Sequence, residues 1–290
     1  MEPELRLAVL IDAENFSSKH VKKLFDEIAE DGHASIRRVY GGWDAPQLRP
    51  WKKVMETYSI STRQECCYSS GKSASDSAMI IDAMDILYTD VVDGFCIASS
   101  DGDFTNLARR LREAGKFILG AGENKTPKAF VNSCNRFIYV DLLDDDASPE
   151  DDSSNGPKAE NAQSSKKDNR QKDYEDNAPS KVIAPTRDNS QDDEIGPTPL
   201  EAIKSALIKY FEAKASLGSE KRAHLSAIGN YLRKKHPDFD CRNYKCKTLA
   251  QFIKRFDEFD IEEQPSEGDP RVKTMYVVCK KSNGDSKKAR

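Results

Sequence analysis

A long polar segment, residues 144–195, divides this 290-residue chain into two parts that each need a core of their own. The segment holds 15 acidic and 7 basic residues, and its large apolar side chains are Tyr174, Val182, Ile183 and Ile195. Such a composition buries too little apolar surface to offset the entropy lost on ordering the chain. We therefore predict a disordered acidic linker over residues 144–197, with one folded domain before it and one after it.

Charge and composition narrow the class of protein. The formal net charge is −4 overall, but residues 1–143 carry −3, residues 144–195 carry −8 and residues 196–290 carry +7. A run of about 18 apolar residues is missing, so we expect no transmembrane helix. The N-terminus MEPELRLAVLIDAEN carries acids where a secretory signal needs bases. Seven cysteines without a CxxC pair, with four scattered histidines, lack the spacing of a zinc site and favour a reduced, cytoplasmic protein.

Before the polar segment, short apolar runs alternate with amphipathic stretches. Regular alternation of strands and helices predicts an α/β fold with a parallel sheet and helices on both faces. Ligands of such sheets bind at the carboxyl ends of the strands. The expected strands cover 7–13, 35–43, 59–66, 94–100, 116–122 and 136–143. The first expected helix begins at Ser17 or Ser18. The other expected helices cover 48–58, 73–88, 104–115 and 127–134.

Acidic residues occur where that rule puts a binding site. Asp12 ends the first expected strand, Asp101 and Asp103 directly follow the fourth, and Asp76 begins the helix before the fourth. We predict that these carboxylates meet at one rim of the sheet. Oxygen ligands suit Mg²⁺ or Mn²⁺, which can activate water and neutralise a phosphodiester. The alternative for each residue is an ordinary cap or turn.

Polar neighbours fit supporting roles around these acids. Asn15 lies three residues after Asp12, where its amide could hold the first turn or a metal-bound water; an ordinary helix cap is the alternative. Ser99 and Ser100 precede Asp101 and could orient carboxylates through hydroxyl bonds, or simply satisfy the loop.

Two further residues are weaker candidates. Lys72 could meet a phosphate, although a surface lysine is the common case. Asp82 lies six residues after Asp76, roughly 240° around an ideal helix, so the two carboxylates do not share a face. We keep Asp82 as a supporting residue.

Two other kinds of site can be weighed. A strand ending in IDAEN is similar to the start of aspartyl phosphatases, but the second acidic position holds Glu14 and no later Lys–Asp pair completes the motif. Gly120 and Gly122 follow a strand as in a dinucleotide-binding loop, but the third glycine is missing.

The segments VLIDAENF, KSASDSAMIIDAMD and GFCIASSDGDFTNLARRLREAGK closely resemble the NYN domain of the LabA-like group, within the PIN-like nuclease superfamily. The resemblance covers roughly residues 5–143, in order and without large gaps. It implies a Rossmann-like fold and metal-dependent ribonuclease activity. It also implies that the family's metal-binding aspartates correspond to Asp12, Asp76 and Asp101, with Asp103 in the neighbouring position.

The segment after the linker is a small basic module. Helices are expected over 199–215, 224–237 and 243–256, and strands near 259–263 and 273–280. Three helices and a two-stranded wing predict a winged-helix domain over 198–280, followed by a disordered basic tail over 281–290. The stretch HLSAIGNYLRKKHPDFDCRNYKCKTLAQFIKRFDEFDIEE resembles an OST-HTH, or LOTUS, domain. That resemblance implies RNA binding, while some relatives instead bind protein partners, namely helicases.

Basic and aromatic residues of this module agree with RNA binding. Basic groups bind phosphates, and aromatic rings can stack on unpaired bases. The alternative is that Tyr231 belongs to the core and the basic groups only solvate the helices. The candidate RNA-binding residues are Tyr231, Arg233, Lys234, Lys235, Arg242, Tyr244, Lys245 and Lys247, with Lys254 and Arg255 nearby.

Together these features predict a metal-dependent endoribonuclease whose domain over 1–143 is tethered to an RNA-binding module. The acids at Asp12, Asp76, Asp101 and Asp103 would bind Mg²⁺ or Mn²⁺, and RNA would be the substrate. A non-catalytic RNA-binding adaptor is the first alternative. A regulator that acts through protein partners is the second.

Overall fold

The computed structural model describes residues 4–43, 46–63, 74–143, 195–216, 222–265 and 273–280. The predicted linker therefore lies outside the described residues except at 195–197. Within the described ranges, no helix is both long and apolar enough to cross a membrane.

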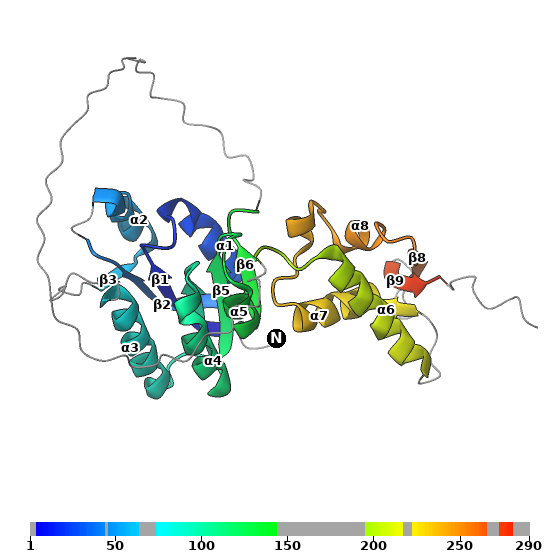
Figure 1. Cartoon of the computed structure of the whole chain (residues 1–290), viewed down its shortest axis with the longest axis horizontal. Helices are drawn as coiled ribbons and strands as arrows, with labels where there is room; N and C mark the ends of the chain where they lie inside the picture. Colours follow the sequence, from blue (N-terminus) through cyan, green and yellow to red (C-terminus); the bar gives the residue numbers. More distant parts are fainter. Residues whose placement is uncertain are drawn as a thin grey trace, which may run out of the picture. The chain divides into compact units, whose positions relative to one another are not determined.

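A six-stranded parallel sheet is the centre of the first domain, in the order β3-β2-β1-β4-β5-β6 (Figure 1). From β1 the chain adds β2 and β3 on one side. Strand β4 then pairs with the other side of β1, and β5 and β6 follow outward from it. The boundary between β1 and β4 is therefore the topological switch point, where α/β sheets bind ligands. The strands are β1 (Leu5–Asp12), β2 (Gly32–Tyr40), β3 (Ser61–Arg63), β4 (Gly94–Ala98), β5 (Phe117–Gly122) and β6 (Arg136–Tyr139).

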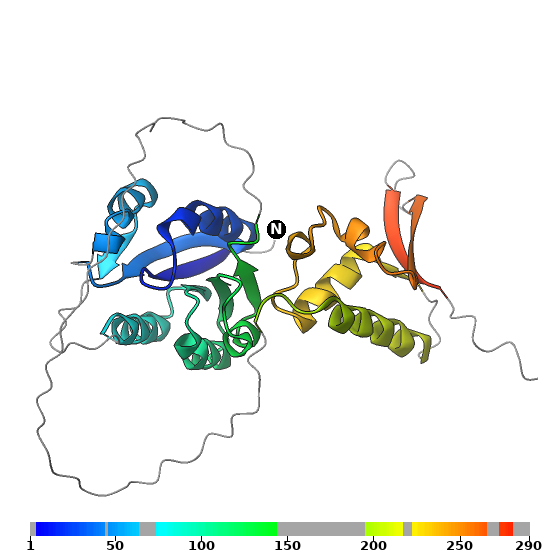
Figure 2. The ribbon, with the colours of Figure 1, turned by 45° about the horizontal axis from the view of Figure 1, so that its top comes forward.

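Helices cover both faces of the sheet, which confirms the predicted α/β class (Figure 2). The first two helices pack on one face and the next three on the other. They are α1 (Val21–Asp31), α2 (Trp51–Tyr58), α3 (Ala74–Thr89), α4 (Thr105–Glu113) and α5 (Lys128–Ser133). Short 3₁₀ turns precede three of them: η1 (Ser18–His20), η2 (Pro46–Leu48) and η3 (Gly102–Phe104).

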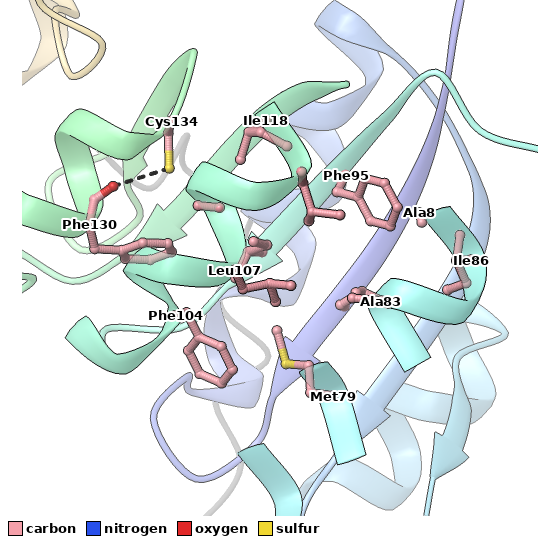
Figure 3. Packing of buried hydrophobic residues seen from close by; sticks show 14 of the residues in the cluster. Ala8, Met79, Ala83, Ile86, Phe95, Phe104, Leu107, Ile118, Phe130 and Cys134 are labelled. Carbon is pink, nitrogen blue, oxygen red and sulfur yellow. Dashed lines mark hydrogen bonds between the residues drawn. The ribbon is translucent and has the colours of Figure 1, made fainter. Parts of the chain in front are cut away.

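The apolar run of β1 is buried on both sides, as expected for a central parallel strand. Ala8 and Leu10 belong to the core under α3, α4 and α5, whereas Val9 and Ile11 belong to the core under α1 and α2. Figure 3 shows Met79 of α3 among the buried side chains of the first of these cores. The two cores hold Asp12 rigidly at the end of β1.

The glycines of β5 are explained by close packing. A Cβ atom at Gly120 would lie 2.4 Å from the ring of Phe137, and one at Gly122 would lie 2.7 Å from the carbonyl oxygen of Ser99. Both distances are below any real contact of a Cβ atom. Close packing of the last strands therefore accounts for both glycines, and a dinucleotide-binding loop is not needed to explain them.

The second domain packs helices on a three-stranded antiparallel sheet of order β7-β9-β8. Its core includes Ile203, Leu207, Leu232 and Phe252. These features are consistent with the predicted winged-helix domain. Its elements are α6 (Leu200–Ser216), β7 (Arg222–His224), α7 (Leu225–Lys235), η4 (Cys241–Tyr244), α8 (Leu249–Ile253), β8 (Phe259–Pro265) and β9 (Lys273–Cys279).

Two details predicted for this domain are wrong. The helix expected over 243–256 is interrupted, because Lys245 adopts a left-handed φ of 58° and ends η4. Helix α8 begins afresh at Thr248, whose hydroxyl accepts a 3.2 Å hydrogen bond from the Gln251 amide. The two predicted strands of the wing are present as β8 and β9, but the sheet has a third strand, β7, that was not predicted. Strand β7 is only three residues long and too short to show a period in sequence.

Candidate functional site

Asp12 ends β1 at the switch point and is 1% exposed. Its Oδ1 accepts hydrogen bonds from the backbone N–H groups of Glu14 (3.0 Å) and Asn15 (3.2 Å). Its Oδ2 accepts from Nδ2 of Asn15 (2.9 Å) and Oγ of Ser99 (2.8 Å). Four donors match the roughly four acceptor positions of a carboxylate, so the buried side chain is held in one orientation.

Ser99 connects this carboxylate to the loop that follows β4. The same hydroxyl oxygen accepts a 3.0 Å hydrogen bond from the N–H of Asp101. Asp101 in turn caps η3, because its Oδ1 accepts a 2.9 Å bond from the N–H of Asp103. One hydroxyl therefore joins the ends of β1 and β4, which are distant in sequence and adjacent in the sheet.

Asp76 lies in the first turn of α3, where its carboxylate interacts electrostatically with the other acids. Its partial burial, followed by the negative charges of Asp12, Asp101, Glu14 and Asp103, raises the pKa of Asp76 to about 6. The structure thus brings the four predicted aspartates into one electrostatic environment at the rim of the sheet.

Glu14 is a fifth member of this group, which we call the acid cluster: Asp12, Glu14, Asp76, Asp101 and Asp103. Its Oε1 accepts a 3.2 Å bond from the Gly42 amide, which holds the side chain across the end of β2. In the sequence, Glu14 was considered only as part of an aspartyl-phosphatase motif. The sequence signal that could have identified Glu14 is its position two residues after Asp12, at the same strand end.

Carboxylate oxygens are the donors that a hard divalent cation prefers. Within the described parts of the chain, however, no three His, Cys, Asp or Glu side chains are grouped so as to hold an ion. The acceptor positions of Asp12 are already filled by protein donors. The donor chemistry therefore fits Mg²⁺ or Mn²⁺, and the more exposed Glu14, Asp76, Asp101 and Asp103 are the side chains with room to turn toward one.

Two predicted supporting residues lie elsewhere, and a third lies outside the described residues. Ser100 is buried, and its hydroxyl oxygen accepts a 2.9 Å bond from the Glu123 amide, so it joins β4 to the end of β5. Asp82 forms an ion pair with Arg38 and accepts a hydrogen bond from the Tyr40 hydroxyl. Asp82 is thus separate from the acid cluster, as its position on the helix predicted. Lys72 is outside the described residues.

The candidate RNA-binding residues divide into exposed cations and packed aromatics. The ring of Tyr231 lies 4.8 Å from that of Tyr210, and the ring of Tyr244 lies 5.0 Å from that of Phe252. Both tyrosines are half-buried, as in the core alternative. Arg242 forms an ion pair with Asp240. The exposed cations are Arg233, Lys234, Lys235, Lys245 and Lys247.

Comparison with known proteins matches both folded segments to domain families. Residues 6–143 match the NYN domain, and residues 197–270 match the OST-HTH/LOTUS domain. A crystal structure of a protein of unknown function from Vibrio parahaemolyticus RIMD 2210633 is similar, with a TM-score of 0.40 and 16% identity over 48% of this chain and 95% of that chain. No curated protein matches. The two folded segments are therefore each similar to a known domain family, the first to NYN domains and the second to OST-HTH/LOTUS domains.

Proposed function

We propose that this protein is a metal-dependent endoribonuclease of the LabA-like group that hydrolyses RNA phosphodiester bonds. The observation that carries the proposal is the acid cluster, five coupled carboxylates at the switch point of an NYN domain. A carboxyl pKa raised by burial and by neighbouring carboxylates, as at Asp76, is typical of functional sites.

The roles of the residues follow from their contacts. Asp12, Asp76 and Asp101 would hold Mg²⁺ or Mn²⁺, and Asp103 would complete the site directly or through water. Asp12 would do so by exchanging one of its four protein donors for the ion. When bound, such an ion lowers the pKa of a bound water and neutralises charge on the phosphodiester. Ser99 and Asn15 hold Asp12 in place, and Ser99 also orders the turn that carries Asp101.

The OST-HTH domain would supply RNA affinity. Its exposed cations, Arg233, Lys234, Lys235, Lys245 and Lys247, attract phosphates independently of base sequence and with a strong salt dependence. We place the protein in the cytoplasm, where its thiols stay reduced. Cys96, Cys134, Cys241 and Cys246, which lie within the described ranges, form no disulfide.

A non-catalytic RNA-binding adaptor is the second candidate, and one observation favours it. The oxygens of Asp12 are saturated by protein donors, and the described carboxylates do not converge in threes. In that case the rim would hold RNA or a protein partner without cutting RNA.

Cleavage of a mixed RNA pool by the full chain, titrated with Mn²⁺ or Mg²⁺, separates these candidates. The nuclease proposal expects cleavage that saturates with metal, stops in excess chelator and is lost in the Asp76→Asn/Asp101→Asn variant. RNA binding measured in parallel should survive that double substitution. A wild-type protein that binds the pool but cuts it in neither metal supports the adaptor instead. Cleavage that persists in chelator refutes the metal-dependent mechanism.

A further inference from the structure

Asp82, in the middle of α3, faces three polar side chains of the neighbouring strands. Its Oδ1 accepts a hydrogen bond from Nη1 of Arg38, and its Oδ2 accepts one from the Tyr40 hydroxyl; both donors are on β2. Nε of Arg63, the last residue of β3, lies 3.7 Å from the same Oδ2. We call Arg38, Tyr40, Arg63 and Asp82 the arginine cluster. The acid cluster includes none of these four residues.

The arginine cluster lies on the same rim and the same face of the sheet as Asp12. Tyr40 is the register partner of Asp12 on one side and of Arg63 on the other, so the three residues form one row across β1, β2 and β3. Tyr40 and Leu10, which is two residues before Asp12, both belong to the core under α3, and this places the row on the α3 face. Neighbouring strands are about 4.8 Å apart, so the backbones of Asp12 and Arg63 are roughly 10 Å apart.

The arginine cluster has an excess of positive charge. Among the described residues, the guanidinium groups of Arg38 and Arg63 share the one carboxylate of Asp82. Burial, followed by the hydrogen bond to Asp82, raises the pKa of Tyr40, so its hydroxyl stays neutral. The formal charge of the cluster is therefore +1. A polyanion that crosses this rim meets repulsion at the acid cluster and attraction at Arg63.

Arg63 is the member of the cluster that can reach a ligand. Its side chain is 51% exposed, compared with 22% for Arg38 and 16% for Asp82. Its main chain is held by Trp43, whose Nε1 donates a 3.3 Å hydrogen bond to the Arg63 carbonyl. Because Asp82 faces Nε, the terminal nitrogens of the guanidinium point to a different side, where they can bind a phosphate in a bidentate manner. This anchoring reduces the entropy that an exposed arginine loses when it binds an anion.

We propose that the arginine cluster is a phosphate subsite of the RNA site, in which Arg63 binds a phosphate next to the one held at the acid cluster. The inference rests on the proposed RNA substrate and adds a positive contact that the acid cluster does not supply. Asp82 acts through Arg63 and is therefore a positioning residue. A strand held at two points along the row has a fixed direction at the phosphodiester to be cut, which an in-line attack requires.

The test is equilibrium binding of a single-stranded RNA pool to the full chain in chelator, at several salt concentrations. Arg63→Gln removes one phosphate contact, so it should weaken binding about threefold to tenfold at low salt and lower the salt slope by about 0.7. Arg63→Lys keeps the charge but loses the bidentate geometry, so its affinity should be intermediate.

Arg6→Gln is the matched control and should bind RNA as wild type does. Arg6 is 48% exposed and pairs with Asp93 at 2.8 Å, so it is similar to Arg63 in exposure and in having an aspartate partner. It lies near the start of β1, at the opposite end of the sheet from Asp12. Both glutamine variants lose one positive charge, so a difference between them depends on position and not on net charge. Thermal melts check that both are folded.

Fluorescence of Trp43 reports on the rim itself. Trp51, the other tryptophan of the chain, is 2% exposed, so a change in emission on adding RNA belongs to Trp43 beside Arg63. Emission should change with RNA in the wild type and in Arg6→Gln, with a weaker midpoint in Arg63→Gln. Equal affinities of the two glutamine variants, or unchanged emission at saturating RNA, would overturn the subsite. Chelator excludes metal-dependent cleavage from the assay, so an Arg63 effect in a protein that never cuts RNA counts against the nuclease proposal alone.

Discussion

The hydroxyl of Ser99 donates a 2.8 Å hydrogen bond to the buried carboxylate of Asp12, across the boundary between β4 and β1. The same oxygen accepts from the amide of Asp101. The two carboxylates that follow neighbouring strands are thus linked through one side chain. Substitution of Ser99 should therefore alter the hydrogen bonding of both Asp12 and Asp101.

Substitution of Ser99→Ala tests this link, with Ser100→Ala as the control. Loss of the Ser99 hydroxyl leaves Asp12 with one donor fewer and the Asp101 amide without its acceptor, which should cost about 1–3 kcal/mol of stability. Residues that orient metal ligands typically change activity about 10- to 100-fold, so Mn²⁺-dependent cleavage should fall within that range. Ser100→Ala should lower stability but retain cleavage, because Ser100 serves the Glu123 amide. Equal loss of cleavage in both variants would argue against a specific role for Ser99.

Asp12→Asn and Asp101→Asn should both abolish metal-dependent cleavage but differ in stability. An amide at position 12 turns one acceptor into a donor that faces other donors, and this should cost about 1–3 kcal/mol. Asp101 is only partly buried and has one such bond, so its substitution should cost less. Chemical denaturation and a gel cleavage assay measure the two effects. Unchanged cleavage in either variant would remove that carboxylate from the mechanism.

Stability of the metal-free protein should depend on pH through Asp76. Because its folded-state pKa is raised from 3.8 to about 6, the folded protein binds this proton more tightly than the unfolded chain does. The resulting stabilisation is present at low pH and is lost as the pH rises from about 4 to about 6. Asp76→Asn should therefore raise the free energy of unfolding at about pH 7.5, by less than about 1 kcal/mol after solvent screening, and with it the melting temperature. Near pH 4 both should stay unchanged.

Thermal melts in chelator at both pH values measure this effect. Metal affinity of the wild type should fall as the pH drops through about 6, because protons then compete for the same carboxylate. A melting temperature that rises equally at both pH values would show that Asp76→Asn acts through packing and not through charge.

Short-range patterns in the sequence were enough to predict most of the helices and strands and the proximity of the acidic residues. The apolar run that ends at Asp12 and the helix that begins near Asp76 are visible in short windows, and parallel strands bring their carboxyl ends to one rim. The break at Lys245 and the three-residue strand β7 were missed. A single left-handed residue or a very short strand leaves no period in a window.

The amino-acid order by itself determined which carboxylates reach the switch point, because position along each strand or helix decides that. Only the tertiary structure decided which serine supports Asp12, since Ser99 and Ser100 differ by which neighbouring strand each faces. Only the tertiary structure, likewise, joined Arg38 to Asp82, which are 44 residues apart. Pairing at that separation depends on how β2 and α3 pack in the folded domain, and this is not encoded in the spacing of charges along the chain.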